Sequence, residues 1–329
     1  MAQPNSSKTV IYAALAGNLL VAVTKFVAAA LSGSSSMLSE GVHSLVDTFN
    51  EVLLLYGLRR AARTPDRAHP LGYGRELYFW SFIVAVLLFA LGAGVSIYQG
   101  VVRVRAPAPI DNATVNYVVL ALSFVFEGTS WRISQRAFRA AKGDLGYWEA
   151  VRRSKDPPSF IVLFEDSAAL IGIVIAAFGT YAADTLQRPV FDGIASILIG
   201  LVLAATACLL ARESEGLLIG ERADPKIAAS IESLAAAEPG VTGANGVLTV
   251  QLAPDQIVAA LSLQFDAALR TPQIEAAVDR LEQRVRERHP QVLALFVKPQ
   301  TRGGFDRNQR ARYGSAAPQA ESSAGEEHP

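Results

Sequence analysis

Six long apolar segments constrain the fold of this chain more than any other feature of its sequence. They cover approximately residues 8–31, 37–58, 77–101, 113–131, 160–183 and 189–211. The hydrocarbon core of a bilayer is about 30 Å thick and takes roughly 20 apolar residues in a helix. The segments therefore predict an all-α membrane bundle of six transmembrane helices, occupying residues 1–212 as one domain.

Composition and charge exclude several classes of protein. Of 329 residues, 51% are hydrophobic and only 18% are charged, whereas soluble chains carry roughly 25% charged residues. Thirty Lys and Arg balance thirty Asp and Glu, which excludes a nucleic-acid binder that works through bulk positive charge. The lone Cys208 leaves no disulfide framework and no cysteine-based zinc site. The chain runs directly into its first apolar segment, so we expect no cleaved signal peptide.

Basic residues between the apolar segments predict the orientation in the membrane. Lys and Arg concentrate in the second and fourth connections, at Arg59, Arg60, Arg63, Arg67, Arg75, Arg132, Arg136, Arg139, Lys142, Arg152, Arg153 and Lys155. The three opposite connections together hold Arg103, Arg105 and Arg188. Since basic loops stay on the cytoplasmic side, both termini are expected there. We expect a multi-pass protein of the inner (plasma) membrane.

Residues 213–300 have the patterning of a small soluble domain. Their order of elements reads helix, strand, strand, helix, strand, which predicts a cytoplasmic two-layer α+β (αββαβ) unit. The remainder, 301–329, is rich in Gly, Ser, Ala, Gln and Glu, and we expect it to be disordered.

Ionisable residues inside the predicted spans indicate a functional site, because each costs about 2.5–3.5 kcal/mol to insert. The second segment holds His43 and Asp47, four residues apart and so on one helix face, with Glu40 on the same stripe. The fifth holds adjacent Glu165 and Asp166, which point about 100° apart on a helix. One imidazole with two or three carboxylates from two helices is a suitable ligand set for a divalent cation.

Structural explanations for these residues also remain open. A buried histidine can be a hydrogen-bonded packing residue, and Glu40 near the start of its helix can face water. Lys25 and Glu127, both within spans, can form an ion pair that stabilises the bundle. Asp192, near the start of the sixth segment, is expected at the interface.

Several stretches of this sequence resemble the cation diffusion facilitator family of divalent metal transporters. SGSSSMLSEGVHSLVDTFNEVLLL is similar to the family's second helix, DRAHPLGYGRE to its loop before helix three, DPPSFIVLFEDSAALIGIVIAAFG to its fifth helix, and ADPKIAASIESLAAAEPGV to the start of its cytoplasmic domain. The resemblance covers about residues 8–300. It is greatest to the subgroup that includes the mitochondrial zinc exporter of animals, which shares the Glu-Asp-Ser-Ala-Ala pattern and the preceding Arg-Arg-Ser-Lys-Asp-Pro.

The resemblance implies a transport site with departures from the family pattern. The helix-two pair is His43 and Asp47, and the helix-five aspartate is Asp166. At the helix-five position where the family has a histidine, this sequence has Val162. A fourth ligand must then come from Glu165, from Glu40 or from water.

The family's other metal positions are also altered in this sequence. In the loop, Asp66 and His69 match the family, whereas Tyr73 replaces its second histidine, so an auxiliary metal site there is expected to be weak or lost. The metal-cluster positions of the soluble domain read Asn245, Ser262, Glu275, Phe296 and Lys298. These residues favour a dimerisation domain without bound metal.

The function that the resemblance implies is efflux of a divalent cation, zinc first, in exchange for protons by alternating access, as a homodimer. Metal binding to a histidine and carboxylates requires their deprotonation and releases protons, and the ordinary pKa of histidine is near 6.5. We expect no enzymatic activity and no prosthetic group, since an intramembrane hydrolase would lack a nucleophile. The alternatives are a non-transporting membrane metal sensor or scaffold, or a transporter selective for Mn, Fe or Co.

Overall fold

The computed structural model describes residues 4–110 and 112–314. Its chain divides into two compact units, 1–219 and 220–329. The elements of the first unit are α1 (Pro4–Ser32), α2 (Ser35–Ala61), α3 (Glu76–Leu87), a π-helical turn η1 (Leu88–Ala93), α4 (Gly94–Arg105), α5 (Ala113–Lys142), α6 (Tyr147–Arg153), α7 (Pro157–Thr185) and α8 (Val190–Ile219). Those of the second unit are α9 (Pro225–Ala236), β1 (Val241–Ala253), β2 (Gln256–Phe265), α10 (Thr271–Arg288), β3 (Val292–Pro299) and α11 (Arg302–Tyr313).

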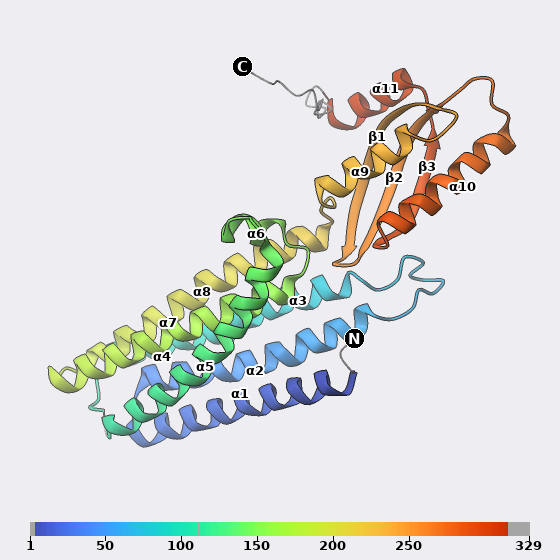
Figure 1. Cartoon of the computed structure of the whole chain (residues 1–329). Coiled ribbons are helices and arrows are strands. Elements are labelled where there is room, and N and C mark those ends of the chain that lie inside the picture. Colours follow the sequence, from blue (N-terminus) through green and yellow to red (C-terminus); the bar gives the residue numbers. More distant parts are fainter. Residues whose placement is uncertain (1–3, 111, 315–329) are drawn as a thin grey trace, which may run out of the picture. The chain divides into compact units, whose positions relative to one another are not determined.

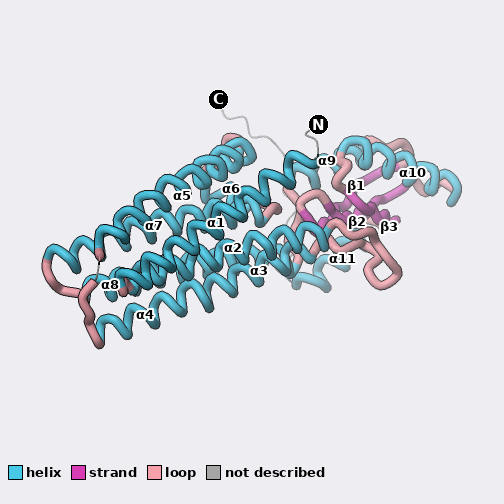
Figure 2. Tube along the Cα trace, turned by 90° about the horizontal axis from the view of Figure 1, so that it is seen from below, coloured by secondary structure: helices cyan, strands magenta, loops and turns pink. Residues whose placement is uncertain are grey.

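The first unit is a bundle in which the long helices lie side by side (Figures 1 and 2). Each of the six predicted apolar segments forms one long helix, and α3, η1 and α4 together form the third. The predicted architecture, a helical membrane bundle followed by a small α+β unit, is confirmed. The short helix α6, between α5 and α7, was not predicted.

Within the described residues, four of the long helices are apolar and long enough to cross a membrane by themselves. They are Glu76–Arg105, Ala113–Ala140, Pro157–Thr185 and Val190–Ile219, and a shorter apolar stretch, Asn18–Ser32, lies in α1. Helix α2 is more polar, because Glu40, His43 and other polar side chains lie on its buried face. Its polarity is thus directed into the bundle, where protein groups replace water as partners.

Close helix packing brings α4 and α8 almost into backbone contact. A Cβ atom at Gly100 of α4 would lie 2.6 Å from the carbonyl oxygen of Gly193 in α8. One at Gly200 would lie 3.0 Å from the carbonyl oxygen of Ala93. Small residues of this kind drive helix association in lipid, where burial of apolar surface between helices gains little.

The second unit is a three-stranded sheet with the order β1-β2-β3. β1 and β2 are antiparallel, and β3 pairs parallel with β2 after the α10 crossover. The apolar face of β2, with Ile257, Ala259, Leu261 and Leu263, packs with buried residues of α9 and α10. The predicted helix–strand–strand–helix–strand order matches these five elements.

The structure differs from the expected disorder at the start of the 301–329 segment. Helix α11 occupies Arg302–Tyr313, and its Thr301 N-cap accepts a hydrogen bond from the Gly304 amide. The backbone of Gly246, with φ of +155°, leaves room for the Phe305 ring. The prediction of disorder relied on the average composition of residues 301–329. One capping residue, Thr301, and one aromatic contact, Phe305, change that average very little. Residues 315–329 lie outside the described residues.

Candidate functional site

Helix α2 supplies the first part of the candidate site. Ser34 caps the helix by accepting a hydrogen bond from the Met37 amide at 3.2 Å. From that start, the helical repeat brings His43 and Asp47 to one face, and His43 Nδ1 lies 3.3 Å from Asp47 Oδ1. The His43 side chain is fully buried, and among the described residues neither ring nitrogen has a hydrogen-bond partner. A buried imidazole without a hydrogen-bond partner calls for an explanation, and a bound cation next to the Asp47 carboxylate is one.

Helix α7 supplies the two adjacent acids, and different neighbours hold them. Glu165, 5% exposed, accepts a hydrogen bond of 2.6 Å from Asn50 of α2. Asp166 accepts hydrogen bonds from Ser130 and Ser134 of α5 at 3.1 and 2.9 Å. The helical twist of about 100° between neighbours explains why the two carboxylates have different partners.

A small cavity of about 20 Å³ connects the acids of three helices. Its walls are formed by Asn18, Ser44, Asp47, Glu51, Glu127, Val162, Glu165 and Asp166. A space of this size holds about one water-sized particle. Asp47, Glu165 and Asp166 therefore meet at one polar space, and Val162 lies in its wall.

Two acids of this cavity, Glu51 and Glu127, were not among the predicted site residues. Glu51 is one turn beyond Asp47 on the same face of α2, and its carboxylate accepts a hydrogen bond of 2.6 Å from Asn18 of α1. The four-residue spacing from Asp47 was the signal available in the sequence. For Glu127 on α5 the sequence signal was its intramembrane charge alone.

Glu40 lies at a different place from Asp47. It is seven residues earlier, which is roughly 10 Å along a helix that rises 1.5 Å per residue, and it does not line the cavity. Its side chain is fully buried, with Oε2 3.1 Å from Lys25 Nζ. The expectation that Glu40 faces water is therefore wrong, because a buried ammonium takes the place of solvent.

Lys25 of α1 places a positive charge next to the buried acids Glu40 and Glu127. Its fully buried ammonium donates to Ser44 Oγ at 2.7 Å and to Glu40 at 3.1 Å, and lies 3.9 Å from Glu127 Oε1. The sequence-based explanation of Lys25 and Glu127 as an ion pair agrees with this geometry.

Asp47, Glu165 and Asp166 line the cavity, and His43 lies next to Asp47, but these candidate ligands do not converge on one point. Among the described residues, no group of three or more His, Cys, Asp or Glu side chains is arranged to hold a metal ion as it stands. Small side-chain movements would be needed, since hydrogen bonds from Asn50, Ser130 and Ser134 hold Glu165 and Asp166 apart. Carboxylate oxygens with one imidazole nitrogen suit first-row divalent cations.

The loop between α2 and α3 has the geometry of a hydrogen-bonded turn. Asp66 Oδ1 accepts from the amides of Ala68 and His69 at 2.9 and 2.7 Å, and Oδ2 accepts from the Tyr73 hydroxyl at 2.6 Å. The Tyr73 hydroxyl, followed by the His69 amide, lowers the pKa of Asp66 to about 2. The Tyr73 hydroxyl thus bonds to the carboxylate that a metal in this loop would need, and a site at Asp66 and His69 stays a prediction.

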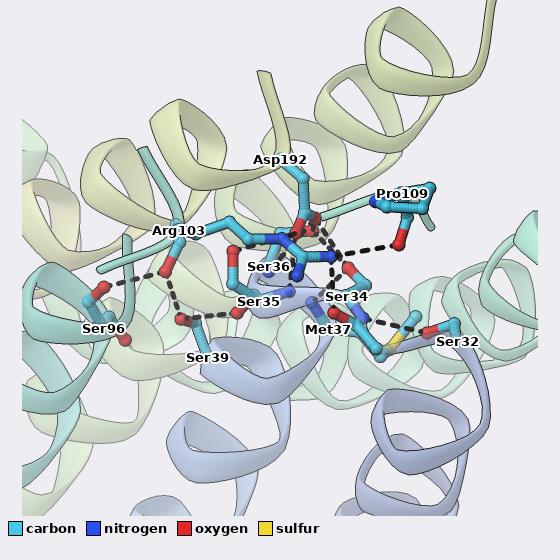
Figure 3. Close-up of polar contacts among 12 residues, drawn as sticks. Ser32, Ser34, Ser35, Ser36, Met37, Ser39, Ser96, Arg103, Pro109 and Asp192 are labelled. Atoms are coloured by element: carbon cyan, nitrogen blue, oxygen red, sulfur yellow. Dashed lines mark hydrogen bonds and ion pairs between the residues drawn. The ribbon is translucent and has the colours of Figure 1, made fainter. Parts of the chain in front are cut away.

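Asp192 forms a second buried polar cluster, shown in Figure 3, at the start of α2. Its carboxylate, on α8, accepts hydrogen bonds from the hydroxyls of Ser34, Ser35 and Ser36 and from the amides of Ser35 and Ser36, at 2.6–3.2 Å. Arg103 Nε lies 3.6 Å away. Asp192 is fully buried inside the bundle, and its expected depth near the membrane interface stays a prediction. A carboxylate at a helix N-terminus is stabilised by free amides and the helix dipole.

In the second unit, polar side chains bond to each other at two of the family's metal-cluster positions. Asn245 Nδ2 donates to Ser262 Oγ at 3.2 Å and to the Gln300 carbonyl at 2.8 Å. Both side chains are buried, at 6% exposure. Phe296, at 59% exposure, and Lys298 lie on exposed positions of β3.

Comparison with known proteins places this bundle in a family. The family model described as "Cation efflux transmembrane domain" matches residues 11–219, which is more than half of the chain. The human "Proton-coupled zinc antiporter SLC30A9, mitochondrial" is 31% identical over 294 residues, covering 88% of this chain and 52% of that protein. "Metal tolerance protein C4" of Arabidopsis thaliana is 36% identical over 220 residues, covering 66% and 48%. "Cation-efflux pump FieF" of Shewanella oneidensis is 24% identical over 275 residues, covering 83% and 87%.

The match covers the membrane unit from the first helix to the last. This chain spans about half the length of the SLC30A9 and Metal tolerance protein C4 relatives. It is a multi-pass membrane protein, with the helix order and the polar cavity described above. The chain therefore belongs to the cation efflux family, also called the cation diffusion facilitators.

Proposed function

We propose that this chain exports a divalent cation, zinc first, in exchange for protons. The observation that carries the proposal is the buried cavity where Asp47 of α2 meets Glu165 and Asp166 of α7, with His43 next to Asp47. Acids buried in a span are costly unless they bind a cation or a proton. The names of the animal relatives, "Proton-coupled zinc antiporter SLC30A9, mitochondrial", support the choice of zinc and protons.

The proposed ligands are His43, Asp47 and Asp166, with Glu165 as a further carboxylate. As ligands these groups are deprotonated, so binding of the cation releases protons and the return step takes protons up. Exchange then requires that the bundle expose the cavity to each side of the membrane in turn. In this assignment the chain's residues bind and release an ion and make no covalent bond, so we propose transport rather than catalysis.

The orientation and location are also proposals. The basic residues of the α2–α3 and α5–α7 connections favour a cytoplasmic position for these loops and for both termini. We propose the inner (plasma) membrane. The printed names of the animal relatives say "mitochondrial", so localisation of a fluorescent fusion in the source cell decides between the two membranes.

The second unit is proposed to dimerise through the sheet face that α9 and α10 leave uncovered. Ala260 of β2 pairs with Leu248 of β1 and with Phe296 of β3, so the three side chains form one row across the sheet. Leu248 is 40% and Phe296 is 59% exposed. Exposed apolar rows of this kind mark interaction surfaces, and a second copy of the chain offers a matching row.

The experiment that tests the function is zinc flux in proteoliposomes. We expect purified protein to move zinc across the vesicle membrane, and Asp47→Asn to reduce the flux to that of empty vesicles. Asn keeps the volume of Asp and removes the anion that the cation needs. Asp184→Asn, at an exposed position near the end of α7, is the matched control and is expected to transport normally. Equal flux by wild type and Asp47→Asn would contradict the proposal.

A panel of zinc, manganese, cobalt and iron in the same vesicles separates the proposed zinc exporter from the other candidates. A wild-type protein that binds these ions without moving any of them would be a membrane metal sensor or scaffold. A protein that moves manganese or iron in preference to zinc would belong to the same family with a different cargo.

A further inference from the structure

Beyond the proposed ligands, the cavity contains two more carboxylates, those of Glu51 and Glu127. Val162 stands where a histidine ligand would be and lies in the cavity wall, so one coordination position is open. Asp47, Glu51, Glu127, Glu165 and Asp166 all reach this cavity. The question is which of the two unassigned acids, Glu51 or Glu127, is available to an incoming ion.

The hydrogen bonds of these acids distinguish them. Glu51 is held by Asn18 at 2.6 Å, and Glu165 is held by Asn50 at the same distance. Glu127 accepts no hydrogen bond from the described residues, and its ionic partner is Lys25, at 3.9 Å. Its residue is only 7% exposed. A buried carboxylate without hydrogen bonds has the most to gain from a new positive partner.

Lys25 does not depend on Glu127 for its own partners. The ammonium donates to Ser44 and to Glu40 at 2.7 and 3.1 Å, both shorter than its 3.9 Å separation from Glu127. Glu40 is itself fixed against α7, because Gly172 leaves room for its carboxylate and any Cβ there would collide with Oε1. Glu127 can therefore turn from Lys25 toward the cavity while Lys25 stays paired and buried.

We propose that Glu127 of α5 is an additional ligand of the divalent cation, beside those on α2 and α7, and that Lys25 holds its carboxylate while no ion is bound. This inference rests on the proposed function and adds a third helix to the site. Lys25 and the cation compete for the same carboxylate, so Lys25 weakens binding and favours release. The α5 helix would thereby respond to occupancy of the cavity.

Zinc affinity in detergent-solubilised full-length protein, measured by competition with a fluorescent chelator, tests both halves of the inference. We expect Glu127→Gln to weaken zinc binding by more than about tenfold, or ~1.4 kcal/mol. We expect Lys25→Met to tighten zinc binding, since the competing ammonium is gone. The double variant is expected to bind as weakly as Glu127→Gln alone. An unchanged affinity in Glu127→Gln, or weaker binding in Lys25→Met, would overturn the inference.

If Lys25→Met does not fold, the number of imidazole ligands of the bound zinc provides a second test. Glu127→His retains Lys25, and X-ray absorption of its bound zinc is expected to show two imidazoles in place of one. Glu149→His, at an exposed position on α6, is the control and is expected to show one. A single imidazole in Glu127→His would overturn the inference. If wild type binds and transports no divalent cation at all, the proposed function fails instead, so the two failures are distinguishable.

Discussion

Single residues decide what this site can hold, and Val162 is the clearest example. A valine in the cavity wall supplies no lone pair, so most of the ligand atoms that the cavity offers are carboxylate oxygens, beside the Asn18 amide and the Ser44 hydroxyl. Oxygen-rich sites lose part of the preference for zinc that imidazole ligands provide. Val162 and Asp166 are one turn apart on α7, so a histidine at 162 would share the face of Asp166.

We therefore predict that Val162→His shifts transport selectivity toward zinc and that Glu165→Gln weakens transport. Competition among zinc, manganese, cobalt and iron in proteoliposomes measures both effects. The expected shift for Val162→His is about tenfold, or ~1.4 kcal/mol, in the ratio of zinc to manganese. Normal transport by Glu165→Gln, together with an unaltered order of metals in Val162→His, would exclude Glu165 from the site.

Tyr73, like Val162, stands where the resemblance to the family implies a histidine ligand, here in the α2–α3 loop. Its hydroxyl bonds to Asp66 and holds the pKa of that carboxyl at about 2, below its ordinary 3.8. Because the pKa of Asp66 is lowered, the bond stabilises the loop fully at pH values above the ordinary pKa of 3.8. This stabilisation is lost only as the pH falls toward 2. At physiological pH the Asp66 carboxyl is therefore ionised and able to accept the Tyr73 hydrogen bond.

We predict that Tyr73→His yields one additional zinc ion per chain, because it frees Asp66 and adds an imidazole near His69. Metal analysis of purified protein against the wild type measures the stoichiometry. Tyr73→Phe removes the hydroxyl without adding a ligand and serves as the control, with no added zinc expected. The same zinc content in all three proteins would show that the loop has no latent site.

At this scale, charge in an apolar segment was the signal that the sequence-based prediction of the site used. His43, Asp47, Glu165 and Asp166 were predicted from their rarity, and the structure brings the three acids to one cavity with His43 beside Asp47. That prediction did not single out Glu51, whose partner Asn18 lies on another helix. Nor did it reveal the partners of Asp192, since these serines are more than 150 residues away in the chain.

At the scale of elements, the start of α2 depends on a residue of α8. Five hydrogen bonds from Ser34, Ser35 and Ser36 converge on the Asp192 carboxylate, with Arg103 nearby. A serine-rich helix start is usually read as a local cap. Here the cap also joins α2 to a distant helix, and α2 carries the proposed ligands.

We predict that Asp192→Asn destabilises the bundle by about 2–4 kcal/mol, since each hydrogen bond to a charged group contributes roughly 1.5–3 kcal/mol. The amide of Asn also presents donors to serine hydroxyls and amides that already donate. Thermal unfolding in detergent measures the effect, with Asp184→Asn as the exposed control. An unchanged unfolding midpoint in Asp192→Asn would mean that the cluster does not stabilise α2.

Element boundaries followed from the sequence less well than element types. The six apolar segments gave the six long helices, but α8 continues to Ile219 and α5 to Lys142, beyond the apolar stretches. Polar extensions of a helix outside the hydrocarbon are satisfied by water, so hydropathy alone does not mark their ends. Helix α11 was missed because its Thr301 cap and Phe305 contact are local features.

At the scale of the whole molecule, the proposed dimer depends on the row of Leu248, Ala260 and Phe296 across the sheet, next to the part of this face that Phe305 of α11 contacts. We predict that Phe296→Asp weakens self-association of the full-length protein by more than about tenfold, or ~1.4 kcal/mol. An exposed aspartate is solvated in the monomer, so the fold is retained, whereas a dimer would bury the charge.

Mass measurement in detergent over a range of protein concentrations checks this prediction. Gln283→Asp, which adds the same charge at an exposed position on α10, is the control and is expected to remain dimeric. A wild-type monomer at high concentration, or a dimer of unchanged affinity in Phe296→Asp, would contradict the proposed interface.

The central claim concerns the whole molecule as well, namely that zinc moves against protons through the cavity of α2, α5 and α7. The most direct measurement follows zinc and pH together inside proteoliposomes carrying matched dyes. We predict that an imposed pH gradient drives zinc uphill, that protons move in the opposite direction, and that a protonophore abolishes the uphill movement. Zinc movement that is indifferent to the pH gradient and unaccompanied by protons would contradict the account.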